Sequence, residues 1–144
     1  MNSFSIFFKS GGGDKISCVN KYWQKITKIF DIMSEYSYST DIDKFHIEMR
    51  VDGDFLKFGD PKGCSNLRLF KKKRMIANTI SFGENIYTDE NVLSEFLIKN
   101  LLLAFEQMIV QLKKEKLNID GEVLLTDLNK YISGLHNDEI KKWK

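Results

Sequence analysis

The chain has 144 residues, of which 42% are hydrophobic and 29% charged, which is the size and balance of one globular domain. A formal net charge of +2 argues against a dedicated nucleic-acid binder or a protein that adsorbs to membranes, since both need a marked basic excess. Cys18 and Cys64 lie far apart and outside any CxxC motif, so they indicate reduced thiols. The N-terminus lacks the basic region of a signal peptide, and no stretch reaches the roughly 18 apolar residues of a membrane span. We therefore expect residues 1–144 to form a single cytoplasmic domain.

The first predicted elements are a strand and a helix. Phe4 to Lys9 combines β-forming and apolar residues, which predicts a strand in a central position of a sheet. A glycine run follows, and Asp14 can cap a helix that extends from about Lys15 to Glu35. Apolar residues recur every three or four positions along this helix and predict one buried stripe: Ile16, Val19, Trp23, Ile26, Phe30 and Met33.

The clearest strand signal is a strict alternation of apolar and polar residues at 45–52. A period of two places one set on a core and the other on a solvent-facing sheet surface. The core set is Phe45, Ile47, Met49 and Val51, and the solvent-facing set is His46, Glu48, Arg50 and Asp52. Asp52-Gly53-Asp54 then predicts a tight hairpin turn, with a return strand at Phe55 to Phe58.

The remaining strand signals surround a basic run. A turn cluster at 59–63 precedes strand-like residues from Leu67 to Phe70, and the basic run Lys71 to Arg74 is followed by an alternating segment from Met75 to Phe82. This pattern fits two strands joined near the basic run, or one long strand with a polar middle. Because charged residues pointing to both faces suit a turn or a sheet edge, we expect the basic run in one of these places.

Two further helices complete the chain. Thr88 or Asp89 caps a helix predicted to reach about Lys116, whose apolar stripe is wide enough to indicate contact on two sides. A last helix is predicted from about Glu122 to Ser133. The order predicts an α+β fold: an antiparallel sheet of about four to five strands, one helix after the first strand, and two C-terminal helices.

No set of residues matches a catalytic or ligand-binding pattern. The glycine-rich loop after the first strand departs from the phosphate-binding P-loop, and there is no G-x-S-x-G turn. The pairs Asp41/Asp43 and Asp52/Asp54 bracket predicted turns, where aspartate is common for its local hydrogen bonds. We therefore expect no catalytic residue, no metal site and no cofactor. A small enzyme with a site around His46, which shares a predicted surface with Glu48, is one alternative.

Four features follow one another over most of the chain. They are the opening strand Phe4 to Phe8, the amphipathic helix after it, the strands between Phe45 and Phe82, and the segment 85–90 that leads into the long Leu/Phe-rich helix. In architecture and composition this arrangement resembles the immunity proteins of bacterial contact-dependent growth inhibition and related polymorphic toxin systems. The resemblance implies a cytoplasmic antitoxin that binds the toxin domain of a neighbouring gene and blocks its active site or substrate access.

The resemblance also bears on the charge of the partner. Many such toxins are nucleases with acidic inhibitors, whereas this chain is slightly basic, which favours a neutral or acidic toxin or an acidic patch within a balanced surface. We expect the partner-binding residues on the solvent-facing strand surface, its turn and the basic run: Glu48, Arg50, Asp52, Asp54, Lys72 and Arg74. No nucleic-acid or membrane partner is expected. The alternatives are an accessory protein that binds nucleic acid through Lys71 to Arg74, and a homodimer formed through the long helix.

Overall fold

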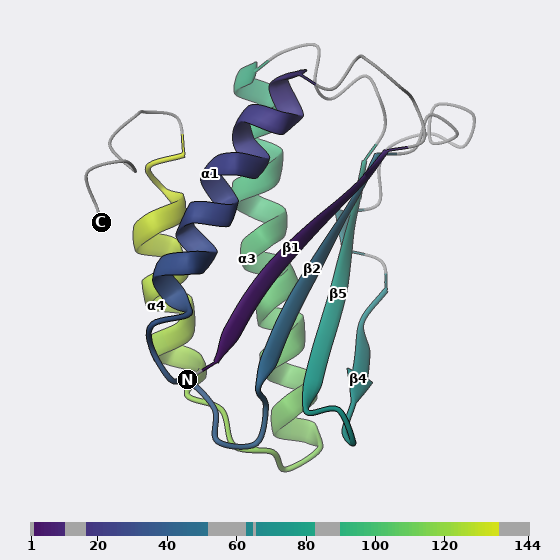
Figure 1. The fold of residues 1–144 in the computed structure, drawn as a ribbon, viewed down its shortest axis with the longest axis vertical. Helices are drawn as coiled ribbons and strands as arrows, with labels where there is room; N and C mark the ends of the chain where they lie inside the picture. The colour runs from purple at the N-terminus through teal and green to yellow at the C-terminus, as the bar shows by residue number, and fades with distance from the viewer. Residues whose placement is uncertain (1, 11–16, 52–62, 65, 83–89, 136–144) are drawn as a thin grey trace.

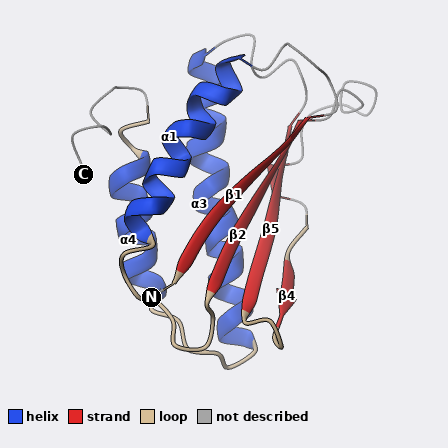
Figure 2. Ribbon diagram, in the orientation of Figure 1, coloured by secondary structure: helices blue, strands red, loops and turns tan. Residues whose placement is uncertain are grey.

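The computed structural model describes residues 2–10, 17–51, 63–64, 66–82 and 90–135, and the statements below concern these residues. Its elements are β1 (Ser3–Ser10), α1 (Ser17–Met33), β2 (Lys44–Val51), β3 (Gly63–Cys64), β4 (Arg68–Phe70), β5 (Met75–Phe82), α3 (Glu90–Lys114) and α4 (Gly121–Ile132). The helices lie on one side of a twisted sheet (Figures 1 and 2). The α+β class, with one helix after the first strand and two near the C-terminus, is confirmed.

The sheet is mixed, so the prediction of an antiparallel sheet is wrong for its long strands. β1 pairs with β2 and β2 pairs with β5, and both pairings are parallel. β3 and β4 lie on the other side of β5 and run antiparallel to it. The described strand order is β1-β2-β5-β3, with β4 also paired to β5. The first strand is therefore an edge strand in this sheet, and not a central one.

The connections explain the parallel strands. α1 carries the chain back along the sheet between β1 and β2, and a helical crossover of this kind joins strands that run in the same direction. β2 has β1 on one side and β5 on the other along its whole length, so neither side is free for a hairpin partner. The predicted turn Asp52-Gly53-Asp54 and return strand Phe55 to Phe58 lie outside the described residues.

The core lies between the helices and one sheet face. The ring of Phe45 stacks on that of Phe4 at 4.9 Å, and the ring of Phe105 in α3 lies 6.5 Å from Phe45 and 6.0 Å from Phe4. Phe30 of α1 meets Phe105 edge-on, with ring centroids 5.8 Å apart. Aromatic contacts of this geometry add to the gain from burying the rings. These ring contacts pack α1 and α3 against the same face of the sheet.

The basic run forms the turn between β4 and β5, which confirms two strands in this region and excludes one long strand. Lys71 to Lys73 are exposed, and the backbone N–H groups of Lys73 and Arg74 close the turn on the carbonyls of Phe70 and Lys71. Arg74 has a left-handed backbone with φ of 52°. The turn joins an edge strand to an inner strand, so its three lysines are exposed at one end of the sheet.

Candidate functional site

The sheet face that points away from the helices carries most of the polar strand residues. α1 packs against β1, α3 packs against β5, and α4 packs against α1 and α3, so no described helix covers this face (Figure 2). Residues paired across parallel strands share a face, and alternate residues share the opposite one. We define the open sheet face by the residues with described side chains that the strand registers place there: Ser3, Ser5, Phe7, Lys44, His46, Glu48, Arg50, Arg68, Phe70, Met75, Ala77, Thr79 and Ser81. Ala77, Thr79 and Ser81 of β5 are buried, so the exposed part of this face lies on the strands around β5.

The alternation predicted for β2 is confirmed by burial. Phe45, Ile47 and Met49 are fully buried against the helices, whereas His46 and Glu48 are partly exposed and Arg50 is exposed. Two predicted binding residues, Glu48 and Arg50, therefore lie together on the open sheet face.

Two groups of polar contacts lie on the open sheet face. The Ser5 hydroxyl lies 2.7 Å from Nδ1 of His46, which links β1 to β2. The Arg68 guanidinium lies 3.7 Å from the Glu48 carboxylate and donates to the Thr79 hydroxyl at 3.3 Å, which links β4 to β2 and β5. Because Glu48 and Arg68 compensate each other, the exposed charges left among the described side chains of this face are the cations Lys44 and Arg50.

The imidazole of His46 resists protonation. Burial lowers its pKa below the ordinary value of 6.5, the positive charge of Arg68 lowers it further, and Glu48 opposes these effects. His46 is therefore neutral near pH 7. In the neutral ring, the tautomer decides whether Nδ1 accepts the Ser5 hydroxyl proton or donates its own.

The lowered pKa of His46 predicts a loss of stability in mild acid. The unfolded chain takes up a proton near pH 6.5, whereas the folded chain takes it up only at lower pH, so the free energy of unfolding falls as the pH drops below 6.5. We expect His46→Gln to lose less stability than the native chain between about pH 7.5 and about pH 5. Urea denaturation of both chains at each pH measures this difference. Equal losses in the two chains would contradict it.

The cavities lined by described residues lie away from His46. The described cavities are lined elsewhere: between β4, its turn and α3, between the 37–40 and 118–120 segments, and along the outer side of α3. In the residues with described placement, no group of three or more His, Cys, Asp or Glu side chains is arranged to hold a metal. The alternative of an enzyme around His46 stays a prediction.

Comparison with known proteins identifies no similar protein. Neither a family model nor a curated protein nor a solved structure matches this chain. No helix in the described ranges is both long enough and apolar enough to cross a membrane. A function for this chain therefore rests on the geometry of its described side chains.

The other predicted binding residues are not gathered with Glu48 and Arg50. Lys72 is exposed in the β4–β5 turn and lines a cavity of about 570 Å³ beside α3. Arg74 ends the same turn on the side of the β2 strand start. Asp52 and Asp54 lie outside the described residues. The structure thus brings two of the six predicted residues together on one face and places two more in a neighbouring turn.

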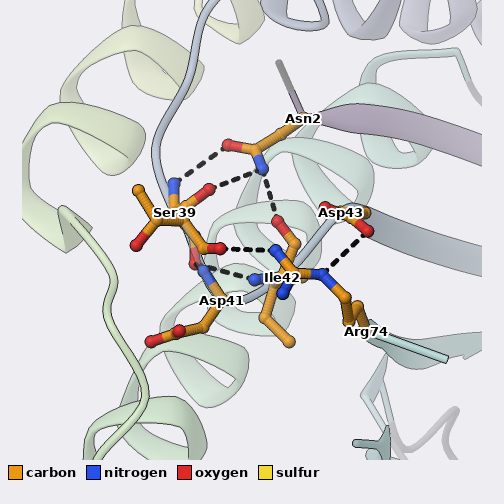
Figure 3. A network of polar contacts seen from close by, with 7 residues as sticks. Asn2, Ser39, Asp41, Ile42, Asp43 and Arg74 are labelled. Atoms are coloured by element: carbon orange, nitrogen blue, oxygen red, sulfur yellow. Dashed lines mark hydrogen bonds and ion pairs between the residues drawn. The ribbon is translucent and has the colours of Figure 1, made fainter. Parts of the chain in front are cut away.

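Arg74 is engaged within the protein. Its Nε donates to the Asp43 carboxylate at 2.9 Å, and its Nη2 donates to the carbonyl of Thr40 (Figure 3). Its own carbonyl accepts the N–H groups of Asp43 at 2.7 Å and Lys44 at 3.1 Å. All four contacts involve residues 40–44, which lead into β2, so the role of Arg74 is to position this segment.

Sequence reasoning missed a buried amide in the same region. The Asn2 side chain is 3% exposed and bonds four backbone groups of the segment between α1 and β2. Its amide donates to the carbonyls of Ser39 at 3.0 Å and Ile42 at 2.5 Å, and its oxygen accepts from the N–H groups of Tyr38 at 2.5 Å and Ser39 at 3.0 Å. An asparagine near a chain start gives no sequence signal for such a role, because all its partners lie over 35 residues away.

Proposed function

We propose that this protein is an immunity protein that binds a cognate bacterial toxin domain through the open sheet face. The bound domain would lose access to its substrate because the rigid sheet covers its active site. The observation that carries this proposal is an exposed aromatic ring, Phe7, next to charged residues on a sheet face that no described helix covers.

Phe7 is exposed to an unusual degree for its type. Its side chain is 54% exposed on the edge strand β1, in register with Glu48. Phe70, on the opposite edge strand β4, is 37% exposed on the same face. Leaving an aromatic ring in water forgoes roughly 1.5–3 kcal/mol that its burial would supply. Aromatic and arginine side chains dominate the binding energy of protein interfaces, so Phe7 and Arg50 are the anchors that we assign.

The charge of the open sheet face sets the chemistry of the partner. Lys44 and Arg50 are exposed, while Glu48 is partly buried and lies 3.7 Å from Arg68. The face therefore has a cationic excess that complements an acidic or neutral toxin surface. Complementary charges around aromatic anchors speed association and fix the orientation of the complex.

Co-purification with the toxin domain encoded by the gene immediately upstream tests the proposal. We expect a one-to-one complex, and rescued growth of cells that express the toxin domain. We further expect Phe7→Ala and Arg50→Glu each to weaken binding by about 30-fold or more, the loss of about 2 kcal/mol that defines an interface anchor. Val123→Ala is the matched control, since Val123 is 46% exposed on α4 and away from the sheet.

Two results would contradict the proposal. One is the absence of both complex and protection when the two proteins are folded. The other is a complex that Phe7→Ala and Arg50→Glu leave as tight as Val123→Ala does. Binding of a single-stranded RNA oligonucleotide that weakens steeply with salt, in place of toxin binding, would favour the nucleic-acid alternative.

A further inference from the structure

A groove follows the flank of the molecule where α3 meets the edge of the sheet. One cavity of about 570 Å³ is lined by residues 69–73 with Gln111 and Glu115. A second cavity, of about 340 Å³, is lined by Leu67, Leu103, Glu106, Gln107, Val110 and Gln111. Gln111 lines both, so the cavities are adjacent. We call them together the α3–β4 groove.

One part of the groove is apolar and exposed. Val110 is 66% exposed and Leu103 is 38% exposed, and they lie seven residues apart, on the same side of α3. Across the groove, Leu67 is only partly buried although it packs against the core. Apolar side chains facing one another across a groove gain free energy when an apolar ligand side chain covers them.

The strand wall of the groove is an open sheet edge. β4 pairs with β5 on one side, and no described strand lies on its other side. Backbone N–H and C=O groups at such an edge can pair with an added strand. A groove between an edge strand and a helix suits an extended peptide, since the strand supplies main-chain hydrogen bonds and the helix supplies side-chain contacts.

The other part of the groove is cationic. Lys71, Lys72 and Lys73 are exposed there, in the turn that follows β4. Lys71 lies 2.7 Å from Glu115, and this hydrogen bond and charge lower the pKa of the Glu115 carboxyl group. Lys73 lies over the ring of Phe70 at 5.8 Å. Three lysines outnumber the single carboxylate, so this part of the groove favours an acidic ligand.

We propose that the α3–β4 groove binds an extended segment of a partner protein as a strand added beside β4. The segment carries apolar side chains at alternate positions, which contact Leu67, Leu103 and Val110, followed by an acidic residue that meets Lys72. The groove shares Phe70 with the open sheet face but includes neither of the proposed toxin anchors, Phe7 and Arg50.

Selection of a displayed random-peptide library on the full chain tests this proposal. We expect enriched peptides with alternate apolar residues and an acidic residue next to them. Their affinity should fall about tenfold or more in Val110→Glu, which places a carboxylate on the apolar part, and in Lys72→Glu, which reverses the charge. Val123→Glu on α4 and Phe7→Ala should leave their affinity unchanged. All four substituted positions are exposed, and thermal unfolding checks that each chain folds.

Four results would overturn the proposal. The first is that no peptide family is enriched. The second is that the enriched peptides bind Val110→Glu and Lys72→Glu as tightly as the native chain. The third is a concentration-dependent dimer in sedimentation experiments that Val110→Glu abolishes, which would assign the groove to a second copy of this chain. Loss of peptide binding in Phe7→Ala alone would also place the peptide on the open sheet face and not in the groove.

Discussion

Replacing Phe105 with alanine is expected to lower the free energy of unfolding by about 3–5 kcal/mol. The Phe105 side chain is fully buried, and its ring lies 6.0 Å from Phe4, 5.8 Å from Phe30 and 6.5 Å from Phe45. These rings come from β1, α1 and β2, so a cavity at Phe105 removes contacts from three elements at once. Surrounding side chains collapse only partly into such a space, which adds a cavity cost to the lost transfer free energy.

Urea denaturation measures the effect of Phe105→Ala. The neighbouring Glu106→Ala is the matched control, because Glu106 is exposed on the same helix and should change stability by about 0.5 kcal/mol or less. A loss in Phe105→Ala as small as that of the control would show that α3 does not pack on the sheet through this ring.

Replacing Asn2 with alanine is expected to cost about 3 kcal/mol or more of stability, because it leaves buried backbone groups without partners at about 1–3 kcal/mol each. The Asn2 amide group bonds two carbonyls and two N–H groups of residues 38–42. Its bonds to Ser39 and Ile42 are drawn in Figure 3. These bonds anchor the chain start to the segment between α1 and β2. Without them, the start of β1 keeps its backbone bonds to Tyr36 and Asp43 but loses four side-chain bonds to the segment that enters β2.

Asn2→Asp distinguishes the two bonds that the Asn2 side chain donates from the two that it accepts. The carboxylate keeps the acceptor toward Tyr38 and Ser39 but loses both donors, and it faces the carbonyls of Ser39 and Ile42. Both Asn2 variants should therefore be less stable than Ser3→Ala, which changes an exposed neighbour. Thermal unfolding of the three chains gives the comparison. Midpoints of both Asn2 variants equal to that of Ser3→Ala would mean that the network does not hold the fold.

Periodicity predicted the faces of the elements well. In the predicted stripe of α1, Ile26, Phe30 and Met33 are buried in the core, whereas Trp23 is only partly buried and Tyr22, outside the stripe, is buried. The alternation in β2 likewise separates its buried and exposed residues. Both results follow because a side chain's direction repeats with the local backbone period, whatever the rest of the chain does.

Strand direction could not be obtained in this way. A period of two is the same in parallel and antiparallel strands, so the pattern of β2 does not reveal that β1 and β5 flank it in parallel. The exposure of Phe7 could not be predicted from the sequence pattern either. A phenylalanine in an apolar strand is predicted to be buried in the core. Phe7 is exposed because it lies on an edge strand, on the face that points away from the helices.

The sequence predicted only part of the candidate site, because local patterns do not show which distant residues a side chain contacts. Lys72 and Arg74 belong to one basic run, yet Lys72 is exposed beside a cavity and Arg74 bonds Asp43, which lies 31 residues earlier. The run gives the charge but not the long-range partner. The alternation in the sequence predicted that Glu48 and Arg50 share one sheet face. That Arg68, Phe7 and Phe70 lie on the same face follows only from the strand registers.

Hydroxyl-radical footprinting of the complex with the cognate toxin domain tests the central claim most directly. Phe7 and Tyr36 serve as internal probes, because they are 54% and 50% exposed and only Phe7 lies on the open sheet face. If this face binds the toxin, the oxidation rate of Phe7 falls several-fold on complex formation while that of Tyr36 stays unchanged. An unchanged rate at Phe7 in a complex that neutralises the toxin would contradict the open sheet face as the binding surface.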